Sequence, residues 1–164
     1  MRAEKLTNLL QQAFAEAQSI AIGNDHSAIE VVHVLIALLN QQGGSVRPIL
    51  NRAGFDVNGL QQQLNKHMDN FPKVSSPTGE VNISQELGRL MNLADRAAQK
   101  NNDQYMSSEI LLQTLLQDTG QIGKMLNKFG DSKAAIAGIV SIRGGDPVND
   151  PDAEGQREAL DKYT

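Results

Sequence analysis

The chain has 164 residues, with 15 Lys and Arg against 19 Asp and Glu, and a formal net charge of −4. This balance argues against a nucleic-acid-binding surface. The absence of cysteine excludes disulfides, thiolate metal ligands and cysteine nucleophiles, and fits a reducing, cytoplasmic location. We expect no membrane span and no signal peptide, because no apolar run is long enough and the charged start is amphipathic.

Apolar residues recur at helical spacing along most of the chain. The predicted helices lie near 4–22, 29–40, 46–52, 57–69, 84–99, 107–117, 122–128 and 133–142. Residues 71–80 contain two prolines and small polar residues, which indicates a loop between the fourth and fifth helices. Segments 31–39 and 110–116 are apolar nearly all round, as is typical of central, buried helices.

The two halves of the chain are copies of one unit. An offset of 77 positions, carried without a gap from Leu6 to Gly43, gives eight identities in 38 positions, against the roughly two or three expected from composition. The identical pairs are Leu10/Leu87, Ala17/Ala94, Ala21/Ala98, Asn24/Asn101, Leu35/Leu112, Leu38/Leu115, Leu39/Leu116 and Gly43/Gly120. A repeat of this kind predicts two similar structural units.

After one residue is dropped in a loop, an offset of 76 aligns residues 50–54 with 126–130. The same offset pairs Asp56 with Ser132 as plausible N-caps, and Leu60 with Ile136 and Leu64 with Val140. The predicted fold is all-α, with two four-helix repeats (6–70 and 83–143) related by a pseudo-twofold axis in one globular domain. We expect the second and sixth helices to form the middle, where the two units meet.

The helical pattern lapses after Arg143 into a polar, acidic tail. We expect a domain over 1–143 and a mobile linker over 144–164, because few apolar residues are available to offset the entropy of ordering. Asp150 as N-cap and Pro151 at the first helical position could begin one further helix.

No set of residues indicates catalysis. Residues 120–125 lack the glycine spacing and the hydroxyl of a phosphate-binding loop. His26 and His33 are seven positions apart with no third ligand at a suitable spacing, so we interpret them as packed or capping residues rather than metal ligands. No catalytic, cofactor-binding or metal residue is predicted. The enzymatic alternative is a small hydrolase using His26 or His33, which a turnover screen with His33→Ala would detect.

Three polar residues, Thr7, Asp103 and Glu109, lie at the starts of the first and sixth predicted helices beside apolar neighbours. Helix-end chemistry explains all three: Thr7 matches the predicted N-cap Ser84, Asp103 closes a turn, and Glu109 favours a helix N-terminus through the dipole. The other interpretation is an interaction surface. The spacing alone leaves both open.

Several motifs together resemble the N-terminal domain and linker of ClpB-type protein disaggregases. They are Leu6-Thr7, Asn24-Asp25-His26, residues 43–46, the double leucines at 38–39 and 115–116, residues 107–109, Arg143-Gly144-Gly145, and residues 148–150 and 159–164. The resemblance covers the whole chain. The duplicated order followed by the Lys-Tyr-Thr ending is its most specific part.

The resemblance implies a non-catalytic, monomeric client-recognition domain that binds apolar segments of unfolded or aggregated proteins and delivers them to a hexameric motor. It implies AAA+ ATPase modules beyond residue 164 that use ATP and Mg²⁺, a homohexamer, and cooperation with the DnaK chaperone in the stress response. The alternative is an adaptor-docking N-terminal domain of a protease-associated Clp ATPase.

The resemblance also implies that the polar cluster Thr7, Asp103 and Glu109 lies beside the client surface. We place the apolar groove on Leu10, Ala13 and Ile110, although their spacing equally allows all three to be core. Residues 108–110 of the second repeat stand opposite residues 31–33 of the first and differ from them. The two halves therefore present different surfaces, and only one groove need bind clients.

Overall fold

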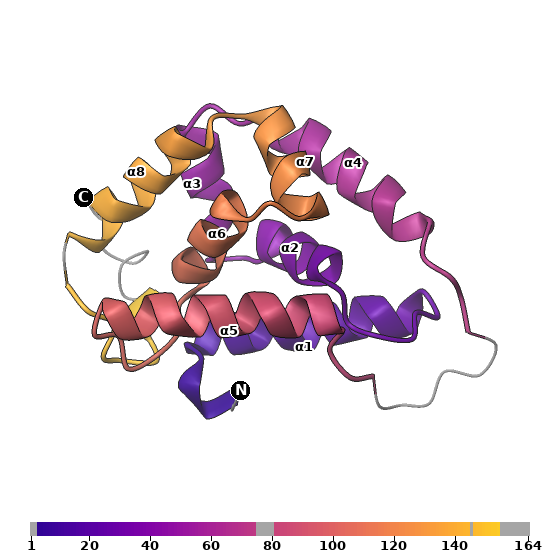
Figure 1. The fold of residues 1–164 in the computed structure, drawn as a ribbon, viewed down its shortest axis with the longest axis horizontal. Helices are drawn as coiled ribbons and strands as arrows, with labels where there is room; N and C mark the ends of the chain where they lie inside the picture. Colours follow the sequence, from indigo (N-terminus) through magenta and orange to yellow (C-terminus); the bar gives the residue numbers. More distant parts are fainter. Residues whose placement is uncertain (1–2, 75–80, 145, 155–164) are drawn as a thin grey trace.

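The computed structural model describes residues 3–74, 81–144 and 146–154. In these ranges the chain forms eight α-helices and a short 3-10 turn, η1 (Ala3–Lys5) (Figure 1). The helices are α1 (Asn8–Gly23), α2 (Val31–Asn40), α3 (Val46–Arg52), α4 (Val57–Asp69), α5 (Gln85–Lys100), α6 (Ser108–Gln117), α7 (Gln121–Phe129) and α8 (Ser132–Arg143). The all-α prediction is confirmed.

The first helix of each repeat begins at a hydroxyl cap. The Thr7 Oγ1 atom accepts a hydrogen bond from the Leu10 N–H at 3.4 Å, and Ser84 Oγ accepts one from the Leu87 N–H at 3.1 Å. These bonds satisfy donors that the first turn of a helix leaves free. Helix α1 begins four residues later than predicted, because Leu6, the residue before the cap Thr7, forms an extended bridge with Met106.

The residues before these caps pair with the opposite repeat. Leu6 forms a parallel bridge with Met106, and Ile83 forms the equivalent bridge with Ile29. The supporting hydrogen bonds also correspond: the Thr7 N–H donates to Met106 O at 3.0 Å, and the Ser84 N–H donates to Ile29 O at 2.9 Å. Leu6 and Thr7 lie 77 positions before Ile83 and Ser84, and Ile29 lies 77 positions before Met106. The pseudo-twofold relation predicted from sequence identities is therefore confirmed.

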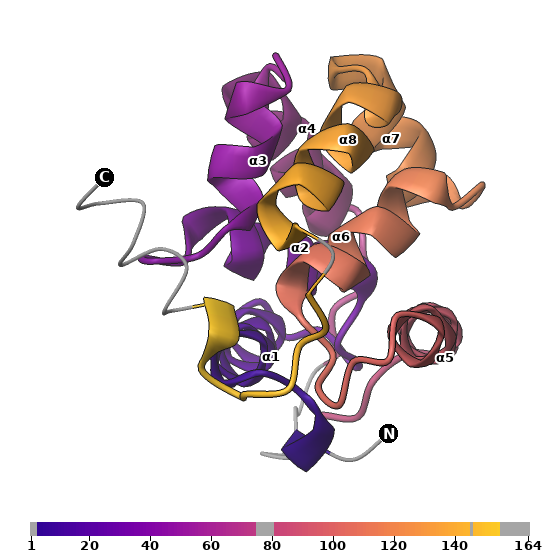
Figure 2. The same ribbon diagram turned by 90° about the vertical axis from the view of Figure 1, so that its left-hand side faces the viewer.

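The helices are arranged in three levels (Figures 1 and 2). Helices α1 and α5 lie along one side, α2 and α6 lie in the middle, and α3, α4, α7 and α8 cover the other side. Nine of the ten residues of α2 and eight of the ten residues of α6 are buried. The central position predicted for these two helices is therefore confirmed.

The two repeats meet mainly through other helices than expected. Helix α3 packs against α8, and α4 packs against α7. These two contacts are equivalent, because each joins the third helix of one repeat to the fourth helix of the other. Helix α3 also packs against α6. The expectation that α2 and α6 form the junction is wrong in this respect. Each central helix packs chiefly against the helices of its own repeat, so the third and fourth helices make most of the contact across the axis.

The register predicted for α8 is wrong by one residue. The N-cap is Asp131, whose Oδ1 accepts a hydrogen bond from the Lys133 N–H at 3.0 Å, and Ser132 is the first helical residue. Ala135 and Ile139 are fully buried, whereas Val140 is 61% exposed. Asp131 lies 75 positions after Asp56, the corresponding cap of the first repeat. The chain therefore loses one residue between the segment aligned at an offset of 76 and the start of α8.

Residues 146–154 pack against the domain. Val148 is 1% exposed and Glu154 is 3% exposed, and Pro151 O accepts a hydrogen bond from the Asn8 N–H at 2.8 Å. Figure 2 shows this segment passing beside the start of α1. The helix predicted to begin after the N-cap Asp150 starts here, since the Asp150 Oδ1 atom accepts a hydrogen bond from the Asp152 N–H at 2.9 Å and residues 153–154 are helical.

This packing differs from the mobile tail expected after residue 143. The physical reason is that two buried side chains and several backbone hydrogen bonds hold a segment whose composition alone is polar. Residues 155–164 lie outside the described residues. The domain boundary at residue 143 stays a prediction.

Candidate functional site

The start of α6 gathers most of the polar residues singled out in the sequence. Thr7 is fully buried, and its hydroxyl donates a hydrogen bond of 2.6 Å to Glu154 Oε1. The same carboxylate oxygen accepts a bond of 2.7 Å from the Ser108 N–H. Burial nevertheless raises the pKa of the Glu154 carboxyl, since it outweighs these two bonds, which lower the pKa.

Asp103 lies in the loop between α5 and α6, where its backbone N–H donates to Ala98 O at 2.9 Å and closes the predicted turn. Its side chain reaches the segment that follows α8. It forms an ion pair with Arg143, and its Oδ1 accepts a hydrogen bond from the Val148 N–H at 2.8 Å. The side chains of Asp103 and Arg143 are 0% and 8% exposed. Asp103 therefore anchors residues distant in sequence as well as its own turn.

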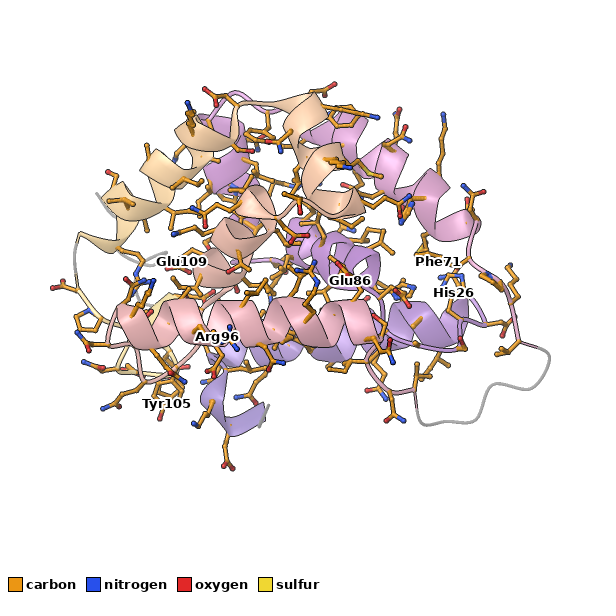
Figure 3. All side chains as sticks on the ribbon, in the orientation of Figure 1. His26, Phe71, Glu86, Arg96, Tyr105 and Glu109 are labelled. Atoms are coloured by element: carbon orange, nitrogen blue, oxygen red, sulfur yellow. The ribbon has the colours of Figure 1, made fainter. Side chains whose placement is uncertain are left out.

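Glu109 occupies the first turn of α6, as predicted, and is fully buried. Figure 3 shows it at the end of α6 that faces α5. The N-cap of this helix is Ser107, whose Oγ accepts from the Ile110 N–H at 3.3 Å. Thr7, Asp103 and Glu109 are thus brought into one region around the start of α6, but their side chains are turned inward.

The three apolar candidates belong to the core. Leu10 and Ile110 are fully buried and Ala13 is 1% exposed. Ala13 also lines a shallow cleft of about 310 Å³ between α1 and the end of α2. The rest of its lining is mainly polar: Gln12, Glu16, Ala37, Asn40, Gln41 and Gln42.

A larger cleft, of about 460 Å³, lies between the two repeats. Its apolar lining comes from α2, α5, α7 and the chain after α4: Val31, Val32, Phe71, Leu90 and Ile122. Its polar lining consists of Glu30, His67, Glu86, Asp118, Gly120 and Gln121. This cleft combines apolar side chains with several carboxylates, a lining suited to extended polypeptide.

Sequence reasoning missed the lining of this cleft. Val31, Val32 and Leu90 have the periodicity of core residues, and they are in fact nearly buried. Their small exposed part faces the cleft only because α2 of one repeat lies near α5 and α7 of the other. A sequence signal was available in Phe71, an aromatic residue within a proline-containing loop.

The two clefts partly correspond under the pseudo-twofold relation. Leu90 and Asp118 of the larger cleft lie 77 positions after Ala13 and Gln41 of the smaller one. At these positions the larger cleft has a bigger apolar residue, Leu90, and a carboxylate, Asp118, which pairs with Arg89. The linings of the two clefts therefore differ at this pair of positions, and the prediction that only one groove binds clients stays a prediction.

His26 and His33 form a buried pair close to the larger cleft. The Glu30 N–H donates to His33 Nδ1 at 2.8 Å, so His33 carries its proton on Nε2 and donates it to His26 Nδ1, also at 2.8 Å. The Phe71 ring stands edge-on to His26, with 5.6 Å between ring centroids, and Figure 3 shows the two side by side. The interpretation of these histidines as packed and capping residues is confirmed.

This environment favours the neutral imidazole at both positions. Burial lowers the pKa of His33 to about 4, with a smaller contribution from His26. The pKa of His26 is lowered by burial and by Lys73. Within the described ranges, no group of three or more His, Cys, Asp or Glu residues is placed to hold a metal ion, and no helix has the length and apolarity to cross a bilayer.

Comparison with known proteins identifies the fold. Residues 5–129 match the family of Clp repeat (R) N-terminal domains. Over its whole length the chain is 52% identical to the chaperone protein ClpB of Pseudomonas putida, and it spans 19% of the length of that relative.

Solved structures are similar in fold. The Hsp104 N-terminal domain from Candida albicans has a TM-score of 0.81 at 19% identity, covering 92% of this chain and 99% of that one. A ClpV N-domain in complex with a VipB peptide has a TM-score of 0.68 at 17% identity, covering 88% of this chain and 90% of that one. The chain belongs to the family of Clp repeat (R) N-terminal domains, which are non-catalytic.

Proposed function

We propose that this domain recognises client proteins by binding apolar segments of unfolded or aggregated chains. The observation that carries the proposal is the larger cleft, which is lined by apolar side chains from both repeats together with carboxylates. The ClpV N-domain of the same fold was solved with a peptide, which supports peptide binding as a use of this fold.

The chemistry of the cleft suits many sequences. Apolar contacts with Val31, Leu90 and Ile122 would require only that the client expose aliphatic or aromatic side chains. Glu30 would accept hydrogen bonds from backbone N–H groups or from Lys and Arg, as would the oxygen lone pairs that Glu86 and Asp118 do not use in their ion pairs with Arg89. Contacts of this kind are individually weak and tolerant, which suits a module that accepts different clients and releases them.

The polar cluster has an indirect role in this proposal. Thr7, Asp103 and Glu109 are buried, so they would act in client binding by holding the start of α1, the loop before α6 and the segment 146–154 in one arrangement. Leu10, Ala13 and Ile110 would support the client surface from the core beneath it.

The proposal extends to the longer protein. ClpB relatives are chaperones about five times the length of this chain. We propose that further modules hydrolyse ATP with Mg²⁺, assemble as a cytoplasmic homohexamer, cooperate with the DnaK chaperone and pull on clients that this domain, itself monomeric, captures.

A pair of matched substitutions tests the cleft. Gln121 and Gln42 are both exposed, and each lines one of the two clefts. Because the chain has no tryptophan, Gln121→Trp and Gln42→Trp each place a bulky fluorescent side chain at a chosen cleft. Titration of Gln121→Trp with a permanently unfolded protein is expected to shift the emission of the introduced indole and to show weakened affinity, with neither effect for Gln42→Trp.

Three other results would redirect the proposal. Effects confined to the Gln42→Trp variant would place the client surface at the smaller cleft. The absence of any binding to unfolded protein by the folded wild-type domain would overturn client recognition. Stoichiometric recovery of one folded adaptor, without unfolded clients, would establish instead the adaptor-docking domain of a protease-associated Clp ATPase.

A further inference from the structure

The segment 146–154 docks on the domain in two parts. The first part has an equivalent in the first repeat, whereas the second part does not. The first part repeats a feature of the first unit. Val148 lies 77 positions after Phe71, and each covers the loop between the first two helices of its own repeat, near Asp103 and His26 respectively. Val148 O also accepts hydrogen bonds from the Gln104 and Tyr105 N–H groups at 2.8 and 3.2 Å. This part is a structural element of the domain.

The second part, residues 151–154, behaves differently. In the first repeat the chain remains on its own unit, where the Val74 N–H donates to Asp25 O at 2.8 Å. In the second repeat Pro151, which is 77 positions later, leaves its unit and accepts a hydrogen bond from Asn8 of the first repeat. Glu154 of the same segment reaches Thr7 and Ser108. The crossing brings a carboxylate to a place where the two repeats meet.

The receiving groups form a carboxylate receptor. The Thr7 hydroxyl and the Ser108 N–H both donate to the same oxygen, at 2.6 and 2.7 Å. The Ser108 N–H belongs to the first turn of α6, a helix of ten residues whose N-terminal end carries partial positive charge. The fully buried Thr7 hydroxyl is a second, independent donor from the other repeat. A seated carboxylate with two convergent donors shows that the receptor is formed.

We propose that residues 151–154 are a displaceable internal ligand, and that this receptor also takes an acidic side chain of a client segment, which competes with Glu154. The inference rests on the proposed client recognition and adds a chemical preference to it. A client that carries Asp or Glu beside its apolar residues would open the segment and bind in its place.

The energetics allow release of this part. Burial raises the pKa of the Glu154 carboxyl, so part of the free energy gained from its two hydrogen bonds is offset by loss of hydration of the ionised form. Pro151 and Asp152 both bond to Asn8, and these contacts lie near the surface, since Asp152 is exposed and Pro151 is half-buried. Val148 can remain docked while the second part opens, because its bonds to Asp103, Gln104 and Tyr105 are separate.

Two substitutions at one position should act in opposite directions. Glu154→Ala removes the acceptor and opens the receptor. Glu154→Gln keeps an oxygen that can accept from Thr7 and Ser108 but removes the buried charge, so it closes the receptor more firmly. Asp69→Ala and Asp69→Asn are matched controls, because Asp69 is exposed at the end of α4, away from the start of α6 (Figure 1).

The probe is a labelled five-residue peptide with an amidated C-terminus that copies residues 150–154, and a second amidated peptide carries Ala in place of the final Glu. Fluorescence anisotropy measures its binding to the 164-residue chain and to each variant. Since apparent affinity scales with the open fraction, an open population on the order of one tenth predicts about a tenfold gain for Glu154→Ala. Glu154→Gln should bind more weakly than wild type. The peptide without the carboxylate should lose most of its affinity for every protein.

Amide hydrogen exchange supplies a readout that needs no peptide. The Asn8 N–H, which donates to Pro151, should exchange faster in Glu154→Ala and more slowly in Glu154→Gln, with the Gln104 amide unchanged. Equal peptide affinities across wild type and both variants, or equal Asn8 exchange, would overturn the internal-ligand proposal. If Glu154→Ala, with its receptor open, does not bind the peptide, the receptor does not accept an external carboxylate.

The same variants separate this proposal from client recognition. Unfolded protein that binds wild type and all variants equally leaves client recognition intact and refutes the role of Glu154. Unfolded protein that binds none of the folded variants refutes client recognition itself.

Discussion

Replacing Asp103 by Ala should destabilise the domain strongly, because its ion pair with Arg143 is almost fully buried. The side chains are 0% and 8% exposed, and the pair joins the loop before α6 to the end of α8. Truncation would leave the guanidinium buried without its partner, which typically costs about 3–5 kcal/mol. The Val148 N–H would also lose its acceptor. This loss is a large fraction of the roughly 5–15 kcal/mol that stabilises an ordinary domain.

Urea unfolding at neutral pH, followed by circular dichroism, measures the effect. Asp103→Asn should lose less stability than Asp103→Ala, since the amide oxygen still accepts from Val148. In the Asp103→Ala/Arg143→Met double variant, the second substitution removes the stranded charge, so the total loss should fall below the sum of the single losses by about 0.5–3 kcal/mol.

The result also decides how Asp103 acts in client binding. An indirect role predicts that affinity for unfolded protein falls in step with stability and with the position of residues 146–148. A loss under about 0.5 kcal/mol in Asp103→Ala, or strictly additive losses in the double variant, would refute the anchoring role. A fully stable Asp103→Asn variant that no longer binds clients would instead assign Asp103 to direct contact.

Three further expectations concern the fold. Leu38→Ala and Leu115→Ala should each lower the free energy of unfolding by about 2–5 kcal/mol in urea titrations, because both side chains are 1% exposed in the central helices; losses under about 0.5 kcal/mol at both would contradict the packing. The folded pKa of His33, near 4, lies below its ordinary 6.5. Between pH 6.5 and about pH 4 the unfolded state therefore binds more protons than the folded state, and the free energy of unfolding should decrease as the pH falls through this range. An NMR titration midpoint near 6.5 for His33 would contradict this expectation. Gly123→Ala should destabilise by about 1–3 kcal/mol or more, because a Cβ there would lie 2.2 Å from Asp118 O. Gly138→Ala, with open space in α8, should stabilise by about 0.5–1 kcal/mol; a reversal in urea midpoints would refute this contrast.

Features that depend on neighbouring residues could be predicted from the sequence. The caps at Thr7 and Ser84 and the apolar character of α2 and α6 follow from local patterns, because capping and helical periodicity involve residues within one or two turns. The duplicated unit was equally accessible, since sequence identity at a constant offset requires no knowledge of contacts. The family resemblance rested on the same motifs.

The register of α8 shows where local reasoning ends. The offset of 76 aligns residues 126–130, but the cap of α8 lies at an offset of 75, which buries Ile139 and leaves Val140 exposed. A helical pattern rich in small residues tolerates either register. The choice is made by packing against α3 and α6.

The candidate site was predicted only in part. The sequence identified Thr7, Asp103 and Glu109 as a group, but it could not show that all three are buried or that Asp103 bonds to residues 40 and 45 positions away. It placed the groove on Leu10 and Ile110, which are core. Periodicity identifies the apolar side of a helix, whereas the depth of a residue depends on which other helices cover that side.

The sequence by itself determined the number and type of helices, the duplication and the family. Only the tertiary structure decided that α3, α4, α7 and α8 join the repeats, that a cleft forms where α2 faces α5 and α7, and that Glu154 reaches Thr7 across 147 positions. The physical reason is that helix formation and capping are governed by bonds within a few residues. Contacts between distant segments depend on loop lengths and on the packing of all the helices together.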